Sequence, residues 1–257
     1  MIRAEQLELL LARLPAELVG DASRRSEQGI RLALRRTPPV ELPPPVERPE
    51  DRLRALEYVV VDVETTGGSP LRGHRITELA AVRLTGTGEV LDEYSTLVNP
   101  QRPIPGYITA LTRITQAMVA DAPLFAEVAP RLRRLLHGAV FVAHNAGFDH
   151  RFMRMELERA GYSLAGRTLC TVRLARRTVP EVTSRSLDSL SYFFGLENEA
   201  RHRAFGDARV TATLLCRLLE RAEEHEVTCW QELERLLRRR ARKPRRRRAS
   251  PHSMEEA

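Results

Sequence analysis

Lysine, cysteine and long apolar runs are all scarce in this chain of 257 residues. Lys243 is the single lysine, so nearly all of the 41 basic residues are arginines. No uninterrupted apolar run approaches the roughly 20 residues that a membrane-spanning helix needs, which argues against a membrane protein. The three cysteines, Cys170, Cys216 and Cys229, are far apart and odd in number, so they predict neither a disulfide framework nor a zinc site. A reducing, cytoplasmic location is therefore expected.

The excess of basic residues is confined to the C-terminus. From Arg238 onward the chain has nine basic and two acidic residues, which accounts for its whole formal charge of +7. The charges of residues 1–237 therefore sum to zero, and the basic character is an appendage. Residues 242–257 predict a basic disordered tail, because a block of like charges repels itself and the segment has no aromatic residues.

Clustered prolines divide the chain near its N-terminus. Residues 1–36 have leucines and isoleucines at helical spacing and predict a helical extension. Six prolines between Pro38 and Pro49 then predict an extended linker over residues 37–55, because proline cannot continue a helix. The main domain is expected over residues 56–225, followed by a C-terminal helix over residues 226–241.

Strand and helix patterns alternate within the main domain. Strands are predicted at residues 58–63, 76–85, 89–98, 139–144 and 166–172. Helices are predicted within residues 114–138, and at 146–161, 187–194, 204–225 and 228–241. Short glycine-containing loops join the first three strands, which favours an antiparallel meander, and the later alternation favours parallel strands. The predicted fold class is therefore α/β, a mixed sheet of three antiparallel strands plus parallel strands, flanked by helices.

Two carboxylates interrupt the valine-rich stretch VVVDVETTGG at residues 59–68. Because side chains alternate along a strand, Asp62 and Glu64 point to the same face. Burying two like charges side by side is costly unless something positive lies between them. The pair therefore predicts a cation at this strand.

Two further segments each bring an acid to the end of an apolar element. In AHNAGFDHRFM, His144 and Asn145 end a strand, and Asp149 lies in the first turn of the next helix. In HRAFGDARV, His202 precedes Asp207 by five residues at the head of an amphipathic helix. Taken alone, Asp149 fits a helix-terminal charge and His202 fits a surface histidine. Taken together, the four carboxylates predict a divalent-cation site, and hard oxygen ligands without cysteine favour Mg²⁺ or Mn²⁺.

The motifs DxETTG, HNxxFD and HxxxxD, in this order and spacing, resemble those of the DEDDh exonucleases. The resemblance is greatest to the proofreading epsilon subunit of bacterial DNA polymerase III and its stand-alone relatives. It covers about residues 58–219 and includes ITELAAV at 76–82 and LVNPQRPIPGYITALTRIT at 97–115. Arg113 departs from the family, which usually has glycine there. The fold that the resemblance implies is ribonuclease H-like, and the implied activity removes 5′-monophosphates one at a time from a 3′ end.

The same resemblance implies roles for individual residues. Asp62, Glu64 and Asp207 would bind one metal ion, and Asp62 would bridge to a second ion held by Asp149. His202 would accept a proton from the attacking water. The implied substrate-binding positions are Thr65, Thr66, Tyr107, Thr112, His144 and Asn145, of which the last two also support that end of the sheet.

The sequence thus predicts a metal-dependent 3′–5′ exonuclease that acts on DNA 3′ ends in proofreading or repair. Trimming of RNA or short oligonucleotides is an alternative with the same chemistry, and a nucleic-acid-binding accessory with a vestigial site is another. The basic tail is expected to bind phosphate nonspecifically. Residues 6–10, QLELL, faintly resemble a sliding-clamp docking motif, so association with the clamp or a polymerase is a further hypothesis. An amphipathic helix packing on the domain is the simpler interpretation.

Overall fold

A computed structural model describes residues 52–197 and 203–238 of the chain. The predicted N-terminal extension, residues 37–51 of the linker, His202 and the basic tail lie outside these residues. Within the described part, no helix combines the length and apolarity needed to cross a membrane.

Five strands form one mixed sheet in the order β3-β2-β1-β4-β5. Their bounds are β1 (Glu57–Thr65), β2 (Ile76–Thr85), β3 (Val90–Leu97), β4 (Val140–Ala143) and β5 (Thr168–Cys170). β1, β2 and β3 pair antiparallel, whereas β4 pairs parallel to β1 and β5 parallel to β4. The mixed sheet predicted from the sequence is therefore confirmed.

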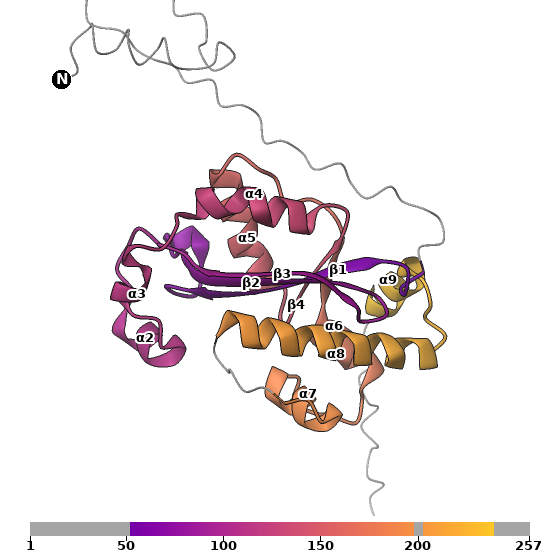
Figure 1. Cartoon of the computed structure of the whole chain (residues 1–257). Coiled ribbons are helices and arrows are strands. Elements are labelled where there is room, and N and C mark those ends of the chain that lie inside the picture. Colours follow the sequence, from indigo (N-terminus) through magenta and orange to yellow (C-terminus); the bar gives the residue numbers. More distant parts are fainter. Residues whose placement is uncertain (1–51, 198–202, 239–257) are drawn as a thin grey trace, which may run out of the picture.

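Helices cover both faces of the sheet. The helices are α2 (Gly106–Thr112), α3 (Gln116–Ala120), α4 (Phe125–Leu136), α5 (Gly147–Arg159), α6 (Thr171–Thr178), α7 (Leu187–Phe194), α8 (Ala204–Glu224) and α9 (Trp230–Arg238), with a short 3₁₀ turn, η2 (Pro70–Arg72). Helices α4 and α5 lie on one face, and α6, α7 and α8 lie on the other (Figure 1). Helices α2 and α3 lie at the end of the sheet where β1 finishes, and α9 lies at the end where β1 starts.

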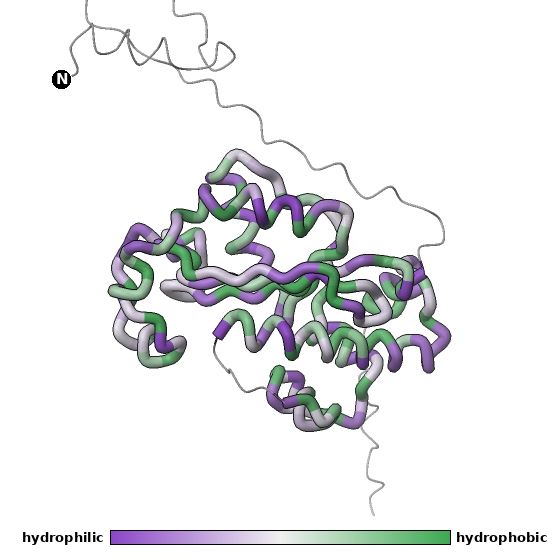
Figure 2. The backbone as a smooth tube through the Cα atoms, viewed as in Figure 1, coloured by the Kyte–Doolittle hydropathy of each residue, from purple (hydrophilic) through white to green (hydrophobic). Residues whose placement is uncertain are grey.

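Alternating side chains of β1 enter two separate cores. Tyr58 and Val60 pack in the core beneath α8, whereas Val59 and Val61 pack in the core beneath α4 and α5. By the same alternation, Asp62 is directed to the α8 side of the sheet. Figure 2 shows hydrophilic and hydrophobic stretches alternating along α8, as expected for a helix with one side against a sheet.

The folded body begins before the predicted start of the main domain. Leu53 is fully buried, and its N–H donates to the Thr228 carbonyl at 2.8 Å. Arg54 forms an ion pair with Glu223 at 2.7 Å. Both residues fall within the predicted linker, because their partners lie far away in the chain and local composition does not reveal them.

Candidate metal centre

Three carboxylates from two elements meet near the end of β1. Asp62 and Glu64 lie on β1, and Asp207 lies in the first turn of α8. One oxygen from each lies within 4.8 Å of the others, a spacing at which a single cation can contact all three. The strand alternation explains this meeting, because it turns the β1 acids toward the face on which α8 packs.

Asp149 lies in the first turn of α5, the helix that follows β4 on the other face. Its side chain is only 4% exposed. One carboxylate oxygen accepts a hydrogen bond from the Val63 N–H at 3.3 Å, which ties it to β1 between the two acids of that strand. The structure therefore brings together all four carboxylates that the sequence motifs predicted.

Without a cation, three of these carboxylates, Asp62, Glu64 and Asp149, have raised pKa values. Burial raises the pKa of Asp62 well above its ordinary range, and the charges of Asp149, Glu64 and Asp207 raise it further. Burial, followed by the charge of Glu78, raises the pKa of Glu64 to about 8. Burial also raises the pKa of Asp149 to about 7. A bound divalent cation would stabilise the ionised form of these three groups, so the set of four carboxylates, with oxygen donors alone, fits Mg²⁺ or Mn²⁺.

An ion pair fixes the start of α8. Glu78 on β2 is 3% exposed, and it accepts hydrogen bonds from Arg203 Nη2 at 2.6 Å and Nε at 3.0 Å. It also accepts from the backbone N–H of Ala204, the first residue of α8, at 3.0 Å. This bidentate pair with an added helix-terminal bond holds the turn that carries Asp207. No sequence motif indicated the pairing, because Arg203 follows Glu78 by 125 residues.

His202 lies outside the described residues, so its role as proton acceptor stays a prediction. Arg203, the next residue, is described and is anchored by Glu78. The ion pair with Glu78 therefore fixes the residue directly before α8.

His144, which follows β4, is bonded through both ring nitrogens. Nδ1 lies 2.8 Å from the Thr171 hydroxyl, and Nε2 lies 2.9 Å from the Arg185 carbonyl. Because a carbonyl only accepts, Nε2 carries the proton and Nδ1 accepts from Thr171. Burial lowers the pKa of His144, which favours this neutral form. Asn145 is exposed, with a left-handed backbone φ of 68° that turns the chain into α5.

Thr65 ends β1 and Thr66 follows it, and both hydroxyl groups are hydrogen-bonded within the chain. Thr65 Oγ1 donates to the Gly67 carbonyl at 2.8 Å. Thr66 Oγ1 lies 3.2 Å from His74 Nδ1 and accepts from the Arg75 N–H at 3.1 Å. The His74 ring covers Gly67 so closely that a Cβ there would lie 2.4 Å from it. The turn after the metal ligands is therefore braced by a histidine that no sequence motif indicated.

The two remaining predicted substrate positions lie on α2 and differ in exposure. Tyr107 is 68% exposed, whereas Thr112 is 1% exposed. The Thr112 hydroxyl donates to the Ile108 carbonyl at 3.0 Å and accepts from the Ile114 N–H at 3.2 Å. Tyr107 is open to a ligand, while the Thr112 hydroxyl stabilises the end of α2. Substrate contact by either residue stays a prediction.

Arg113 ends α2 in a backbone conformation that suits glycine. Its φ is 62° and its ψ is 11°, and its N–H donates to the Thr109 carbonyl at 2.8 Å. The left-handed conformation costs a residue with a Cβ roughly 1–2 kcal/mol. The chain thus keeps the helix end that a glycine would form, at a cost in stability.

Known proteins are similar to this chain in sequence and in fold. A sequence model of the family described as Exonuclease matches residues 59–215, a range that contains all four carboxylates. The chain is 38% identical over 181 residues to a DNA polymerase III PolC-type protein of Caldanaerobacter subterraneus subsp. tengcongensis, covering 70% of this chain and 13% of that protein. It is also 38% identical over 180 residues to the 3′-5′ exonuclease DinG of Bacillus subtilis, covering 70% of this chain and 19% of DinG. The chain therefore spans less than a fifth of either relative.

A solved structure of similar extent is Exonuclease X in complex with 5′ overhanging duplex DNA. Its TM-score with this structure is 0.55, at 30% sequence identity. The match covers 70% of this chain and 99% of that chain. The ribonuclease H-like fold expected from the motifs is thereby confirmed.

Proposed function

The chain belongs to the exonuclease family, with the DEDDh type of site, and on this basis we propose that it hydrolyses phosphodiester bonds at DNA 3′ ends. It would release nucleoside 5′-monophosphates one at a time in proofreading or repair. The observation that carries the proposal is the convergence of Asp62, Glu64 and Asp207 within 4.8 Å, inside the range that matches the family.

The four carboxylates would hold two divalent cations, Mg²⁺ or Mn²⁺. Asp62, Glu64 and Asp207 would contact one, and Asp149 would hold the second, with Asp62 between them. When bound, such ions stabilise the charge on the attacking and leaving oxygens of a displacement at phosphorus. His202 would take the proton from the attacking water, a task that suits an unperturbed histidine pKa of about 6.5.

Other residues would position these groups and the substrate. Glu78 and Arg203 hold the first turn of α8, so the ligand at Asp207 keeps its place as the substrate binds. Tyr107, exposed on α2, would contact the terminal nucleotide. Thr66 and its partner His74 would keep the turn after β1 in one conformation.

The broader setting of the activity is part of the same proposal. The PolC-type name of one relative supports a role beside a polymerase, and the name of DinG supports an activity of 3′–5′ polarity. The DNA in the Exonuclease X complex supports DNA as the substrate. A cytoplasmic location and docking on a sliding clamp rest on the sequence alone.

Oligonucleotides labelled at one end test the proposal directly. Single-stranded DNA and RNA of the same sequence, labelled at the 5′ or the 3′ end, are incubated with Mg²⁺, Mn²⁺ or EDTA. A 3′ label should be released at once as a mononucleotide, and a 5′ label should remain on products that shorten stepwise, with DNA degraded faster than RNA. Faster loss of RNA would assign the enzyme to RNA 3′ ends. Binding without hydrolysis under every condition would identify a vestigial site.

A further inference from the structure

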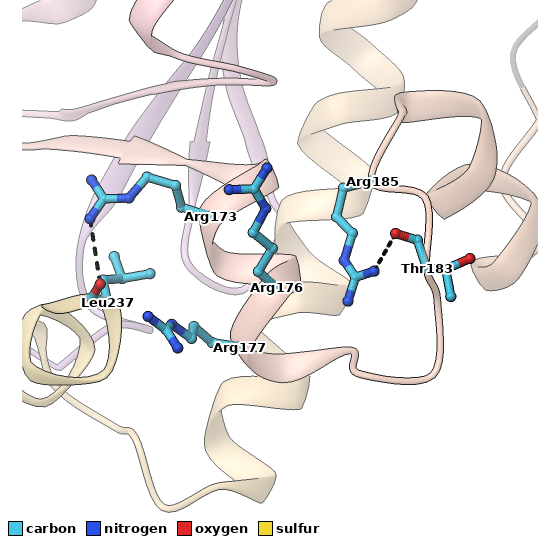
Figure 3. Close-up of a pocket in the computed structure, with 6 residues that line it drawn as sticks. All are labelled: Arg173, Arg176, Arg177, Thr183, Arg185 and Leu237. Atoms are coloured by element: carbon cyan, nitrogen blue, oxygen red, sulfur yellow. Dashed lines mark hydrogen bonds between the residues drawn. The ribbon is translucent and has the colours of Figure 1, made fainter. Parts of the chain in front are cut away.

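A cluster of arginines surrounds a cavity on the α6 side of the molecule. The cavity has a volume of about 470 Å³ and lies between α6, the loop that follows it, and α9 (Figure 3). Its described lining, which we call the arginine pocket, consists of Arg173, Arg176, Arg177, Thr183, Arg185 and Leu237. Four of these six residues are arginines, and no carboxylate is among them.

Like charges around one cavity repel one another, because arginine stays protonated at every physiological pH. Two nearby acids form ion pairs with arginines outside the pocket. Glu181, in the loop after α6, pairs with Arg221, and Glu234 on α9 pairs with Arg238. An anion in the pocket would relieve the repulsion, so the charge of the lining selects for a negatively charged ligand.

Two of the arginines are oriented by backbone carbonyls, which leave the positive charge in place. Arg185 donates to the Thr183 carbonyl at 2.6 Å and to the Val179 carbonyl at 3.2 Å. Its Nε is buried and has no hydrogen-bond partner among the described residues. Arg173 donates to the Leu237 carbonyl at the long distance of 3.5 Å. Each of these bonds uses one of the five N–H donors of a guanidinium group, so Arg173 and Arg185 both keep further N–H donors for an anion.

Arg185 also connects the pocket to the metal centre. Its carbonyl accepts from Nε2 of His144, which lies two residues beyond the position in β4 that pairs with Val60. Position 144 is therefore level with Asp62 on the neighbouring strand. Helix α6 starts at the same place, because Thr171 also contacts His144. The α6 arginines follow Thr171 by two to six residues, roughly 3 to 9 Å further along the helix axis.

We propose that the arginine pocket binds phosphate groups of the nucleic-acid strand whose 3′ end lies at the metal centre. This proposal rests on the proposed function and concerns how the strand is held away from the reacting end. Guanidinium groups suit phosphate, because their planar donors can bind two of its oxygens at once. Leu237 immediately precedes the basic stretch that begins at Arg238, so pocket and tail are adjacent in the chain.

The test compares two variants of the whole 257-residue chain that lose the same charge. The first is R173Q/R176Q, in which both changed residues are exposed, so folding should be retained. The matched control is R134Q/R154Q, whose residues are exposed on α4 and α5 across the sheet. Binding of a fluorescent long single strand of DNA and of a trinucleotide is measured by anisotropy over a range of salt, in EDTA.

For the long strand, R173Q/R176Q should reduce the salt slope of binding by about 1.4, because each lost phosphate contact is worth ~0.7. Its affinity at low salt should fall on the order of tenfold on the same basis. The control should bind like the unmodified chain, and the trinucleotide should bind equally to all three proteins, because it cannot reach the pocket.

Pyrophosphate is measured as a third ligand. Three results would overturn the proposal: an unchanged slope, an equal loss in the control, or a loss of pyrophosphate binding alone with the long strand unaffected. The last would assign the pocket to a small free phosphate compound. Because EDTA removes hydrolysis from the measurement, the outcome is independent of the proposed function. A chain that cleaves nothing with Mg²⁺ could still show the change in slope, and an active exonuclease could lack it.

Discussion

Buried carboxylates occur in two settings in this domain, and they differ in what neutralises them. Glu78 and Glu156 are 3% and 1% exposed, and both are paired with arginine. Glu78 contacts Arg203 at 2.6 Å, and Glu156 contacts Arg75 at 2.5 Å and Arg159 at 3.1 Å. In these two places the chain itself supplies the positive charge.

The two acids near the end of β1 have no such partner in the part of the chain that the structure describes. Asp62 and Glu64 form no ion pair with any described residue, and burial is the main reason that the pKa of each is raised. Glu64 lies directly opposite Glu78 in the register of β1 and β2, so an arginine is only one strand away and yet pairs with Glu78. The chain thus neutralises the acids that hold its structure and leaves the others for a cation.

The largest expected effect comes from removing one of the unpaired acids. Asp62→Asn should lower turnover on a labelled DNA strand by roughly 10³-fold or more, because metal ligation supplies several kcal/mol to the displacement. Its circular dichroism spectrum should match that of the unmodified chain. The control Glu158→Gln changes an exposed acid on α5 and should leave turnover unchanged. Retained activity in Asp62→Asn would refute the metal assignment.

The metal-free protein should also lose stability as the pH rises. The pKa of Glu64 is about 8 and that of Asp149 about 7 in the folded chain, whereas unfolded carboxylates ionise near pH 4. Between these limits the folded state binds more protons than the unfolded state, so the free energy of unfolding falls with rising pH.

Thermal unfolding in EDTA should therefore show a Tm at least about 3 °C lower at pH 8 than at pH 5, given the usual relation between stability and Tm. Mn²⁺ at pH 8 should raise the Tm again, because only the folded state holds the four acids together. A Tm in EDTA that rises over this pH range would contradict the raised pKa values.

Breaking an arginine pair should have a smaller effect on turnover, and the two pairs should differ. Glu78→Gln and Glu156→Gln should each lower the free energy of unfolding by about 1–3 kcal/mol, because each leaves an arginine with a weakened partner. Only Glu78→Gln should also lower turnover, by about 10- to 100-fold, since Glu78 holds the turn with Asp207. Equal turnover in the two variants would show that this ion pair does not position the site.

The smallest effect concerns the end of α2. Arg113→Gly should raise the free energy of unfolding by about 1 kcal/mol, because glycine adopts a positive φ without steric cost. Arg113→Ala is the matched control, since it removes the same side chain and keeps the Cβ. Denaturant unfolding of both variants measures the difference. Equal free energies of unfolding for the glycine and alanine variants would mean that the positive φ does not destabilise a residue with a Cβ at position 113.

Most of the elements could be predicted because local patterns determine them, although the helices α2 and α6 were not predicted. The meeting of the four acids was expected from three motifs that resemble those of the DEDDh exonucleases. Alternation along β1 directed Asp62 and Glu64 to one face, and the amphipathic pattern after Arg203 predicted the helix that carries Asp207. Strand β2 and helix α7 have the predicted bounds of 76–85 and 187–194. In each case the residues that decide the structure are neighbours in the sequence, so the pattern contains the information.

The supporting contacts could not be predicted, because they join distant parts of the chain. Glu78 and Arg203 meet only after the sheet and α8 have packed, and neither has a distinctive sequence context. His144 was expected beside the substrate, but both of its nitrogens are engaged by Thr171 and Arg185. The positive φ of Arg113 was also hidden, because arginine rarely adopts it.

The pairing of Leu53 with Thr228 has a consequence for how this domain can be built into larger proteins. Arg52 and Cys229 pair through an isolated antiparallel β-bridge next to that contact. The first described residues therefore lie against the loop that leads into α9. This junction is at the end of the sheet where β1 starts, whereas the acids lie toward its other end. Entry and exit of the chain therefore share one side, as in modules that tolerate insertion into longer polypeptides. In the PolC-type relative the matched segment makes up 13% of the protein. With both connections on one side, a domain of this kind can be joined to other domains without covering the end of the sheet that carries the acids.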